Sequence, residues 1–204
     1  MLRIAPLAIA YALWVVFFIT WNVFDRSSAA TVATPSDRSS GRVSRWGTGG
    51  RGERLYSLVI ALGLVMIVLA PVTSIAGRIW VNPPALDWAM LLVMAAGIAW
   101  CWWARLHLGL FWSANVTRKE GHHVVDTGPY RLVRHPIYTG FIVIYVGMAI
   151  ICATALALLA VPVMTLGLWL KARVEEKFLI EELGASIYGP YRARTPMLLP
   201  RIQP

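Results

Sequence analysis

Charged residues are scarce in this sequence, and four long stretches contain none. Only 14% of the residues are Asp, Glu, Lys or Arg, whereas a soluble domain contains about 25%. The stretches without charge are 4–24, 55–77, 88–104 and 136–170. This scarcity argues against an ordinary soluble domain and favours a protein embedded in a lipid bilayer.

The length of these stretches predicts how many times the chain crosses a membrane. A helix needs roughly 20 apolar residues to cross a hydrocarbon core, so each of the first three stretches supplies one span. The fourth has 35 residues and would form a helix of about 52 Å, too long for one crossing. We expect it to fold as a hairpin that turns near Cys152–Thr154, with Pro162 bending the second arm. The predicted fold is all-α, a multi-pass membrane protein whose five helices cover about 4–24, 55–77, 86–104, 136–152 and 155–170.

Cysteine and metal-binding patterns are also sparse. Two isolated cysteines, Cys101 and Cys152, support neither a disulfide framework nor a metal site, and we interpret them as packing residues. No two of the four histidines have the H-x-x-x-H spacing of a zinc site on a helix, so no metal is predicted. No span interior carries an Asp, Glu, Lys or Arg that would mark a transport path.

The first apolar run is expected to be a retained span rather than a cleaved signal peptide. It has 21 residues and only Arg3 before it, whereas the apolar region of a signal peptide has about 7–15 residues.

Basic residues predict the orientation of the chain. All but two of the 19 Lys and Arg residues lie in 25–54, 105–135 and 171–204, which the five-span arrangement places on one face; the exceptions are Arg3 and Arg78. The positive-inside rule makes this face cytoplasmic. We therefore expect the N-terminus outside and the C-terminus and active site in the cytoplasm, in the inner membrane if the organism is bacterial. The net charge of +9 indicates contact with anionic lipid rather than a nucleic-acid partner.

The chain divides into two regions within one domain. Residues 1–104 form an N-terminal three-span region with a polar connector at 25–54. Residues 105–204 form a second half that contains every histidine and most acidic residues. In this half, "DTGPY" at 126–130 predicts a short helix capped by Asp126 or Thr127.

Opposite charges flank the predicted hairpin. Arg134 and His135 precede Pro136, which suits the first turn of a helix, and Glu175 and Glu176 follow the second arm. The hairpin brings these ends together as a cytoplasm-facing pocket with an apolar floor, which suits a zwitterionic ligand beside a lipophilic one. Because adjacent helical residues point about 100° apart, we expect only one of the two glutamates to face the pocket squarely.

Two segments of this half resemble a known family. "GHHVVDTGPYRLVRHPIYTGF" at 121–141 and "RVEEKFLIEELGASIYGPYRA" at 173–193 are similar to isoprenylcysteine carboxyl methyltransferases and the related phospholipid methyltransferases. "WSANV" at 112–116 is similar to the stretch just upstream. The resemblance covers about 105–200, and residues 1–104 match only as hydrophobic spans. Members bind S-adenosylmethionine in a cytosolic pocket and methylate an acceptor embedded in the membrane.

The resemblance implies roles at matching positions. The catalytic residues would be His135, Glu176, which would face the ammonium or ribose of the cofactor, and Arg173, which would approach the carboxylate of the acceptor. Two adjacent histidines stand where the family usually has one, which leaves open whether His122 or His123 lines the cofactor. The cofactor-binding residues implied are His122, His123, Val124, Val125, Tyr130, Arg134, His135, Pro136, Ile137, Tyr138 and Glu176.

The function expected is therefore methyl transfer from S-adenosylmethionine to a lipid-like or lipidated small molecule, above all the carboxylate of a prenylcysteine. Phospholipid N-methylation, thiol S-methylation, an NADPH-dependent sterol-type reductase and a non-enzymatic transporter or scaffold remain alternatives. We expect the acceptor to enter from the lipid beside Gly140 and Gly147. The sequence does not indicate an oligomeric state.

Overall fold

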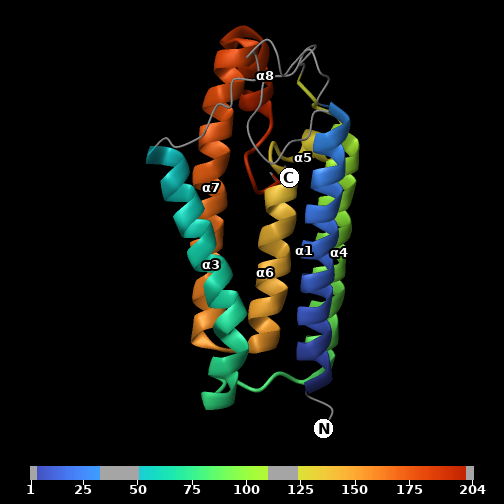
Figure 1. Cartoon of the computed structure of the whole chain (residues 1–204), viewed down its shortest axis with the longest axis vertical. Coiled ribbons are helices and arrows are strands. Elements are labelled where there is room, and N and C mark those ends of the chain that lie inside the picture. The colour runs from blue at the N-terminus through green and yellow to red at the C-terminus, as the bar shows by residue number, and fades with distance from the viewer. Residues whose placement is uncertain (1–3, 33–50, 110–123, 201–204) are drawn as a thin grey trace.

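The chain forms a bundle of long helices that alternate in direction, with short helices gathered at one end (Figure 1). The structure is a computed structural model that describes residues 4–32, 51–109 and 124–200. No strand occurs within these ranges, so the predicted all-α class is confirmed. In chain order the helices are α1 (Ile4–Val32), α3 (Arg51–Ala76), α4 (Pro84–Leu108), α5 (Pro129–Leu132), α6 (Pro136–Cys152), α7 (Ala155–Leu183) and α8 (Ala185–Arg194).

The long helices are those of a multi-pass membrane protein. The segments long and apolar enough to cross a bilayer are Ala5–Val23, Arg51–Thr73, Pro84–Leu108 and Ala155–Glu181, and α6 is a shorter apolar helix of 17 residues. Large apolar side chains such as Val16, Leu58 and Leu92 are exposed on the outside of the bundle. Water would make such a surface unstable, whereas lipid covers it without cost.

The observed helices are longer than the predicted spans. α1 continues to Val32 and α3 begins at Arg51, so both ends of the predicted connector 25–54 are helical. α7 continues past the apolar stretch to Leu183, and Gly184, whose φ is 87°, ends it.

The predicted hairpin turns where the sequence indicated. α6 ends at Cys152, Ala153 adopts a left-handed conformation with φ of 54°, and α7 starts at Ala155. The hydroxyl of Thr154 accepts a hydrogen bond of 3.2 Å from the backbone N–H of Ala157. This bond satisfies one of the free donors at the start of α7.

The unequal arms of the hairpin determine which residues meet. α6 has 17 residues and α7 has 29, which at 1.5 Å per residue gives lengths of about 25 Å and 43 Å. Because both arms begin at the same turn, α7 extends well beyond the first residue of α6. Glu175 and Glu176 therefore stand level with His135. Helices α5 and α8 lie toward this end of the bundle (Figure 1).

α4 and α6 pack closely through glycine. A Cβ atom on Gly140 of α6 would overlap the sulfur of Cys101 and lie 3.0 Å from the carbonyl oxygen of Gly97. Gly147 faces α4 in the same way, since a Cβ there would lie 2.6 Å from Cγ of Met94. The expectation that an acceptor enters beside these glycines is therefore wrong, because α4 fills the space that the missing side chains leave.

This contact leaves no room for a larger side chain at Gly140. We expect Gly140→Ala to lower the melting temperature in detergent, because the added methyl meets a backbone oxygen that cannot move aside and overpacking costs about 1–3 kcal/mol. Gly189→Ala is the matched control, since a Cβ on Gly189 of α8 meets nothing within 4 Å. Equal melting temperatures for the two variants would contradict the packing described.

Candidate active site

His135 occupies the junction between α5 and α6, where the C-terminal tail returns to the bundle. It is the N-cap residue of α6, and Pro136 follows as the first helical residue. The backbone N–H of His135 donates to the carbonyl of Met197 over 3.1 Å, and that of Arg134 donates to Pro196 over 2.9 Å. The tail thus satisfies backbone donors that the helix start leaves free and fixes the backbone of His135.

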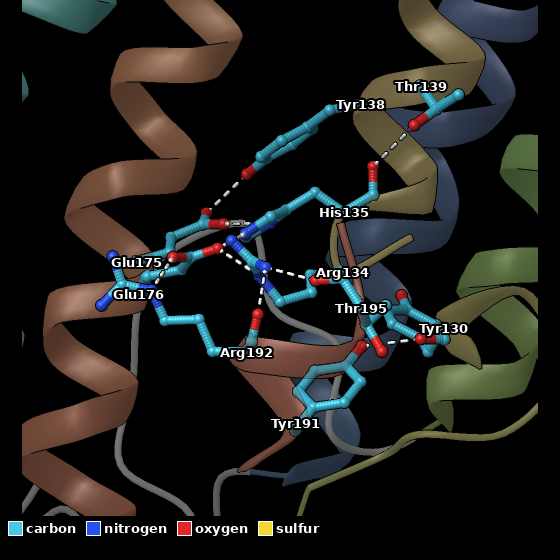
Figure 2. A network of polar contacts seen from close by, with 10 residues as sticks. All are labelled: Tyr130, Arg134, His135, Tyr138, Thr139, Glu175, Glu176, Tyr191, Arg192 and Thr195. Atoms are coloured by element: carbon cyan, nitrogen blue, oxygen red, sulfur yellow. Dashed lines mark hydrogen bonds and ion pairs between the residues drawn. The ribbon is translucent and has the colours of Figure 1, made fainter. Parts of the chain in front are cut away.

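Both glutamates of α7 contact the imidazole of His135 (Figure 2). Nδ1 of His135 lies 3.5 Å from Oε2 of Glu175, and Nε2 lies 3.3 Å from Oε1 of Glu176. The expectation that only one glutamate faces the site is wrong, because the two ring nitrogens point in different directions and each meets a different residue. Burial of the ring disfavours the imidazolium, but hydrogen bonds to both carboxylates outweigh burial and raise the pKa of His135 above its ordinary value.

Glu176 is the centre of the network on the side of the tail. Its side chain is only 3% exposed, and Oε1 accepts from Nε of Arg134 over 2.7 Å. Oε2 lies 3.3 Å from Nε of Arg192 on α8. Arg134 also donates to the carbonyl of Arg192 over 2.8 Å and to that of Thr195. A buried carboxylate is stable only when paired, and here the pairs join α7, the α5–α6 junction and α8.

Glu175 forms a second group of contacts on the side facing the bundle. Its Oε1 accepts from the hydroxyl of Tyr138 over 2.5 Å and lies 3.9 Å from Nζ of Lys171. The rings of Tyr138 and His135 are parallel within 2°, with centroids 5.4 Å apart. The ammonium of Lys171 lies 5.5 Å from the centre of the Tyr138 ring. The site therefore has two sides, one facing the tail and one facing the bundle.

The turn before α5 is held by α8 and α4. The hydroxyl of Tyr191 on α8 donates to the carbonyl of Tyr130 over 2.8 Å. The ring of His107 on α4 stacks on Tyr130 with centroids 6.4 Å apart, and it also lies under Gly128, where a Cβ would approach to 2.7 Å. Burial raises the pKa of the Tyr130 hydroxyl. Gly128, with φ of 54°, is the N-cap of α5.

The predicted caps of α5 are therefore wrong, because both side chains have other partners. The hydroxyl of Thr127 hydrogen-bonds Nε2 of His107 over 2.9 Å, and the carboxylate of Asp126 forms an ion pair with Arg194 of α8. Their contacts attach the turn to α4 and α8 instead of capping the helix.

The remaining sequence-predicted residues lie at varying distances from His135. Pro136 and Ile137 are buried, and the carbonyl of Pro136 accepts from the indole N–H of Trp100 over 2.9 Å. Val125 is half-buried and packs against the core, and Val124 is half-buried as well. His122 and His123 lie outside the described residues.

Arg173 points away from this network. Its side chain is exposed, and its guanidinium lies 4.8 Å from the centre of the Trp169 ring. Arg173 is two residues from both Lys171 and Glu175. On a helix this separation is about 200° around the axis, so Arg173 lies on the opposite side of α7. The structure thus brings together Arg134, His135, Tyr138 and Glu176, but not Arg173.

The composition of the network suits a small ligand that carries both charges. Two carboxylates and an imidazole lie beside guanidiniums and aromatic rings. The network reaches water at Arg192, whose side chain is 53% exposed. In a buried site, charged and polar groups act more strongly on a charged ligand than they would in water. The apolar helix α6 begins directly after His135.

A comparison with known proteins locates this network within a family. The model of the isoprenylcysteine carboxyl methyltransferase (ICMT) family matches residues 89–181, which contain α5, α6 and most of α4 and α7. Residues 89–181, a little under half of the chain, are therefore similar to this family. The match includes both arms of the hairpin and therefore His135, Glu175 and Glu176.

Curated relatives of this chain carry several names. It is 29% identical over 125 residues to the cobalt-zinc-cadmium resistance protein CzcN of Cupriavidus metallidurans. The aligned region is 60% of this chain and 52% of the relative. It is 40% identical over 73 residues to methanethiol S-methyltransferase 2 of Bradyrhizobium diazoefficiens, 36% of this chain and 27% of the relative. It is 26% identical over 86 residues to protein-S-isoprenylcysteine O-methyltransferase B of Arabidopsis thaliana, 42% of this chain and 44% of the relative. The chain thus spans about half, or less, of the length of these relatives.

Sequence reasoning missed several members of the network. Arg192, Thr195 and the carbonyls of the tail were not expected, because their contacts depend on the path of the chain after α8. Lys171 was also missed, although its spacing of four residues from Glu175 indicates that both lie on one face of α7. That spacing is the signal that could have found it.

The contacts of His135 predict how stability depends on pH. The pKa of His135 is raised in the folded protein, so the stabilisation by its imidazolium is complete below the unfolded value of about 6.5 and is lost as pH rises through the folded value. We expect the melting temperature of the wild type, relative to His135→Gln, to fall as pH increases above about 6.5. A difference between the two proteins that does not change with pH would show that the imidazole is neutral throughout.

Proposed function

We propose that this chain is an S-adenosylmethionine-dependent methyltransferase that methylates the carboxylate of a lipidated, prenylcysteine-like acceptor. The observation that carries the proposal is the convergence of Glu175 and Glu176 on His135 inside the region matched by the ICMT family. The Arabidopsis relative is named for O-methylation of protein-S-isoprenylcysteine, which supports this acceptor class.

The residues present fit S-adenosylmethionine. The cofactor carries an ammonium, a carboxylate, a sulfonium and ribose hydroxyls, and the network offers a carboxylate and guanidiniums for these groups. Arg192 is the most exposed partner of Glu176, so the ammonium or ribose of the cofactor would replace it with least disturbance. Arg134, Val124, Val125, Tyr130, Pro136, Ile137 and Tyr138 would form the surrounding wall, together with His122 or His123.

The chemistry demands alignment rather than acid–base catalysis. When bound, S-adenosylmethionine supplies a sulfonium methyl that an ionised carboxylate attacks: an O–C bond forms, the C–S bond breaks with its electron pair on sulfur, and no proton moves. His135 and the tail would hold the cofactor side of the site, while the start of α6 would exclude water from the reacting atoms. A cation on the side of the site facing the bundle, rather than the exposed Arg173, would meet the acceptor carboxylate.

Transfer of a labelled methyl group tests this function directly. Purified protein would be incubated with methyl-labelled S-adenosylmethionine and N-acetyl-S-farnesylcysteine, and the lipid product treated with alkali. We expect label to be released as methanol, because a methyl ester is hydrolysed whereas methyl amines and thioethers are stable. Alkali-stable label in a lipid amine or a thiol would instead identify one of the other methyl acceptors, and binding of NADPH in place of S-adenosylmethionine would identify a reductase.

Glu176 provides a test of the cofactor site itself. We expect Glu176→Gln to weaken S-adenosylmethionine binding about tenfold or more, because a charge-assisted contact contributes about 1.5–3 kcal/mol. Calorimetry would measure the affinity. Glu181→Gln, on the exposed side of α7 one turn further on, is the control and should bind as the wild type does. If the two variants bind the cofactor equally well, Glu176 does not face it.

The orientation predicted from basic residues is also testable. We propose that the end of the bundle containing His135 faces the cytoplasm and the end containing the α6–α7 turn faces outside. A single cysteine introduced at the exposed position Ser186 should react only with reagent on the cytoplasmic side, and one at the exposed position Val81 only from outside. The native Cys101 and Cys152 are buried and should stay unlabelled. Labelling of both new cysteines from one side would reject the five-span topology.

A further inference from the structure

Two cations of α7 lie near the site, and only one of them lies on the side facing the bundle. Lys171 is four residues before Glu175 and shares its face of the helix, whereas Arg173 is exposed on the opposite face and stacks on Trp169. Lys171 also lies over the ring of Tyr138 at 5.5 Å. An acceptor that reaches the site along the side facing the bundle therefore meets Lys171 before it meets any part of Arg173.

The ammonium of Lys171 keeps the capacity to bind a further anion. Its distance of 3.9 Å to Glu175 is too long for a hydrogen bond. Glu175 itself is held more tightly by the hydroxyl of Tyr138, at 2.5 Å, and by His135. The side chain of Lys171 is 22% exposed, so its attraction for an anion is screened less than that of a fully exposed lysine.

α3 forms the opposite wall at this point. α3 and α7 run antiparallel and close together: a Cβ on Gly63 would lie 3.2 Å from the backbone nitrogen of Met164, and one on Gly167 would lie 3.0 Å from that of Ile60. Gly63 therefore lies level with Met164, and Ile60, three residues earlier in α3, lies level with Gly167, three residues later in α7. Extending this register by four residues from Ile60 places Tyr56 level with Lys171.

Tyr56 also lies on the face of α3 that contacts α7. Gly52 approaches Val174, where a Cβ would lie at 3.6 Å, and Tyr56 falls midway between Gly52 and Ile60, at helical spacing along one stripe. Its side chain is half-buried and lies near the carboxylates of Glu53 and Glu175 and near Tyr138. The phenol of Tyr56 therefore belongs to the same cluster as Lys171, although α3 lies outside the segment that the ICMT family matches.

We infer that Lys171 and Tyr56 together bind the anionic head group of the acceptor, and that Arg173 does not. This inference rests on the proposed function, whose acceptor it places on the side of the site facing α3. A carboxylate entering there would be repelled by Glu175 alone, and the ammonium of Lys171 supplies the opposing charge. The hydroxyl of Tyr56 adds a neutral hydrogen-bond donor, so this pair selects acids over neutral analogues of the same lipid.

Two matched probes separate charge recognition from lipid binding. N-acetyl-S-farnesylcysteine carries a carboxylate, and its carboxamide has the same lipid without the charge. Binding of each probe, and of S-adenosylmethionine, would be measured for the full chain in detergent. The variants are Lys171→Gln, Lys171→Arg, Tyr56→Phe and Arg173→Gln.

We expect Lys171→Gln to weaken binding of the acid about tenfold and to leave binding of the amide unchanged. Lys171→Arg should restore most of the affinity for the acid, because it retains the charge. Tyr56→Phe should weaken binding of the acid about threefold, as expected for a neutral hydrogen bond, and Arg173→Gln should leave binding of both probes unchanged. Unaltered affinity for S-adenosylmethionine in each variant would show that the fold is intact.

The inference is overturned if Lys171→Gln weakens binding of both probes equally, or if Arg173→Gln produces the selective loss. Failure of the proposed function looks different. If the wild type prefers the acid, loses this preference when Lys171 is replaced, and transfers no methyl group, the head-group site is supported and the methyltransferase function is rejected. A wild type that transfers methyl but binds the acid equally well without Lys171 would reject only the head-group site.

Discussion

The ionic contacts between the start of α6 and the end of α7 are the interaction on which the rest of this structure depends. Taking charged groups out of water costs several kcal/mol per ion, and Glu176 is almost fully buried. That cost is offset by its pairing with Arg134, His135 and Arg192. Because these partners come from different helices, the cluster requires the hairpin, α8 and the tail to adopt one arrangement together.

The depth of the site follows from the lengths of two helices. α6 is shorter than a typical membrane span, and α7 is longer. The cluster therefore lies at the end of the short helix and against the side of the long one, where we expect the boundary between hydrocarbon and water. A polar cofactor and a lipophilic acceptor can meet at such a boundary, since neither has to cross into the other's medium.

Different parts of the chain serve the two sides of this site. The region matched by the ICMT family contains His135, Glu175, Glu176 and Lys171. The tail contacts that close the proposed cofactor side come from α8 and the residues after it. The wall of the proposed acceptor side comes from α3. Both lie outside that match. Related proteins can therefore share the residues of the matched region and differ in the segments that surround them. Such differences are a physical basis for different acceptors, including that of the thiol methyltransferase that this chain resembles.

The sequence by itself determined the elements whose cause is local. The runs without charge predict the helices, Pro136 and Gly184 start and stop them, and the hairpin turn follows from a stretch too long for one crossing. His135, Arg134, Tyr138 and Glu176 could be grouped because a hairpin brings its two ends together whatever its packing. Only the tertiary structure decided that both glutamates reach His135, that the tail binds the start of α6, that Gly140 and Gly147 face α4, and that Lys171 rather than Arg173 lies beside Tyr138. These facts depend on the rotation of each helix about its axis and on the path of the tail, which side chains distant in sequence determine through packing.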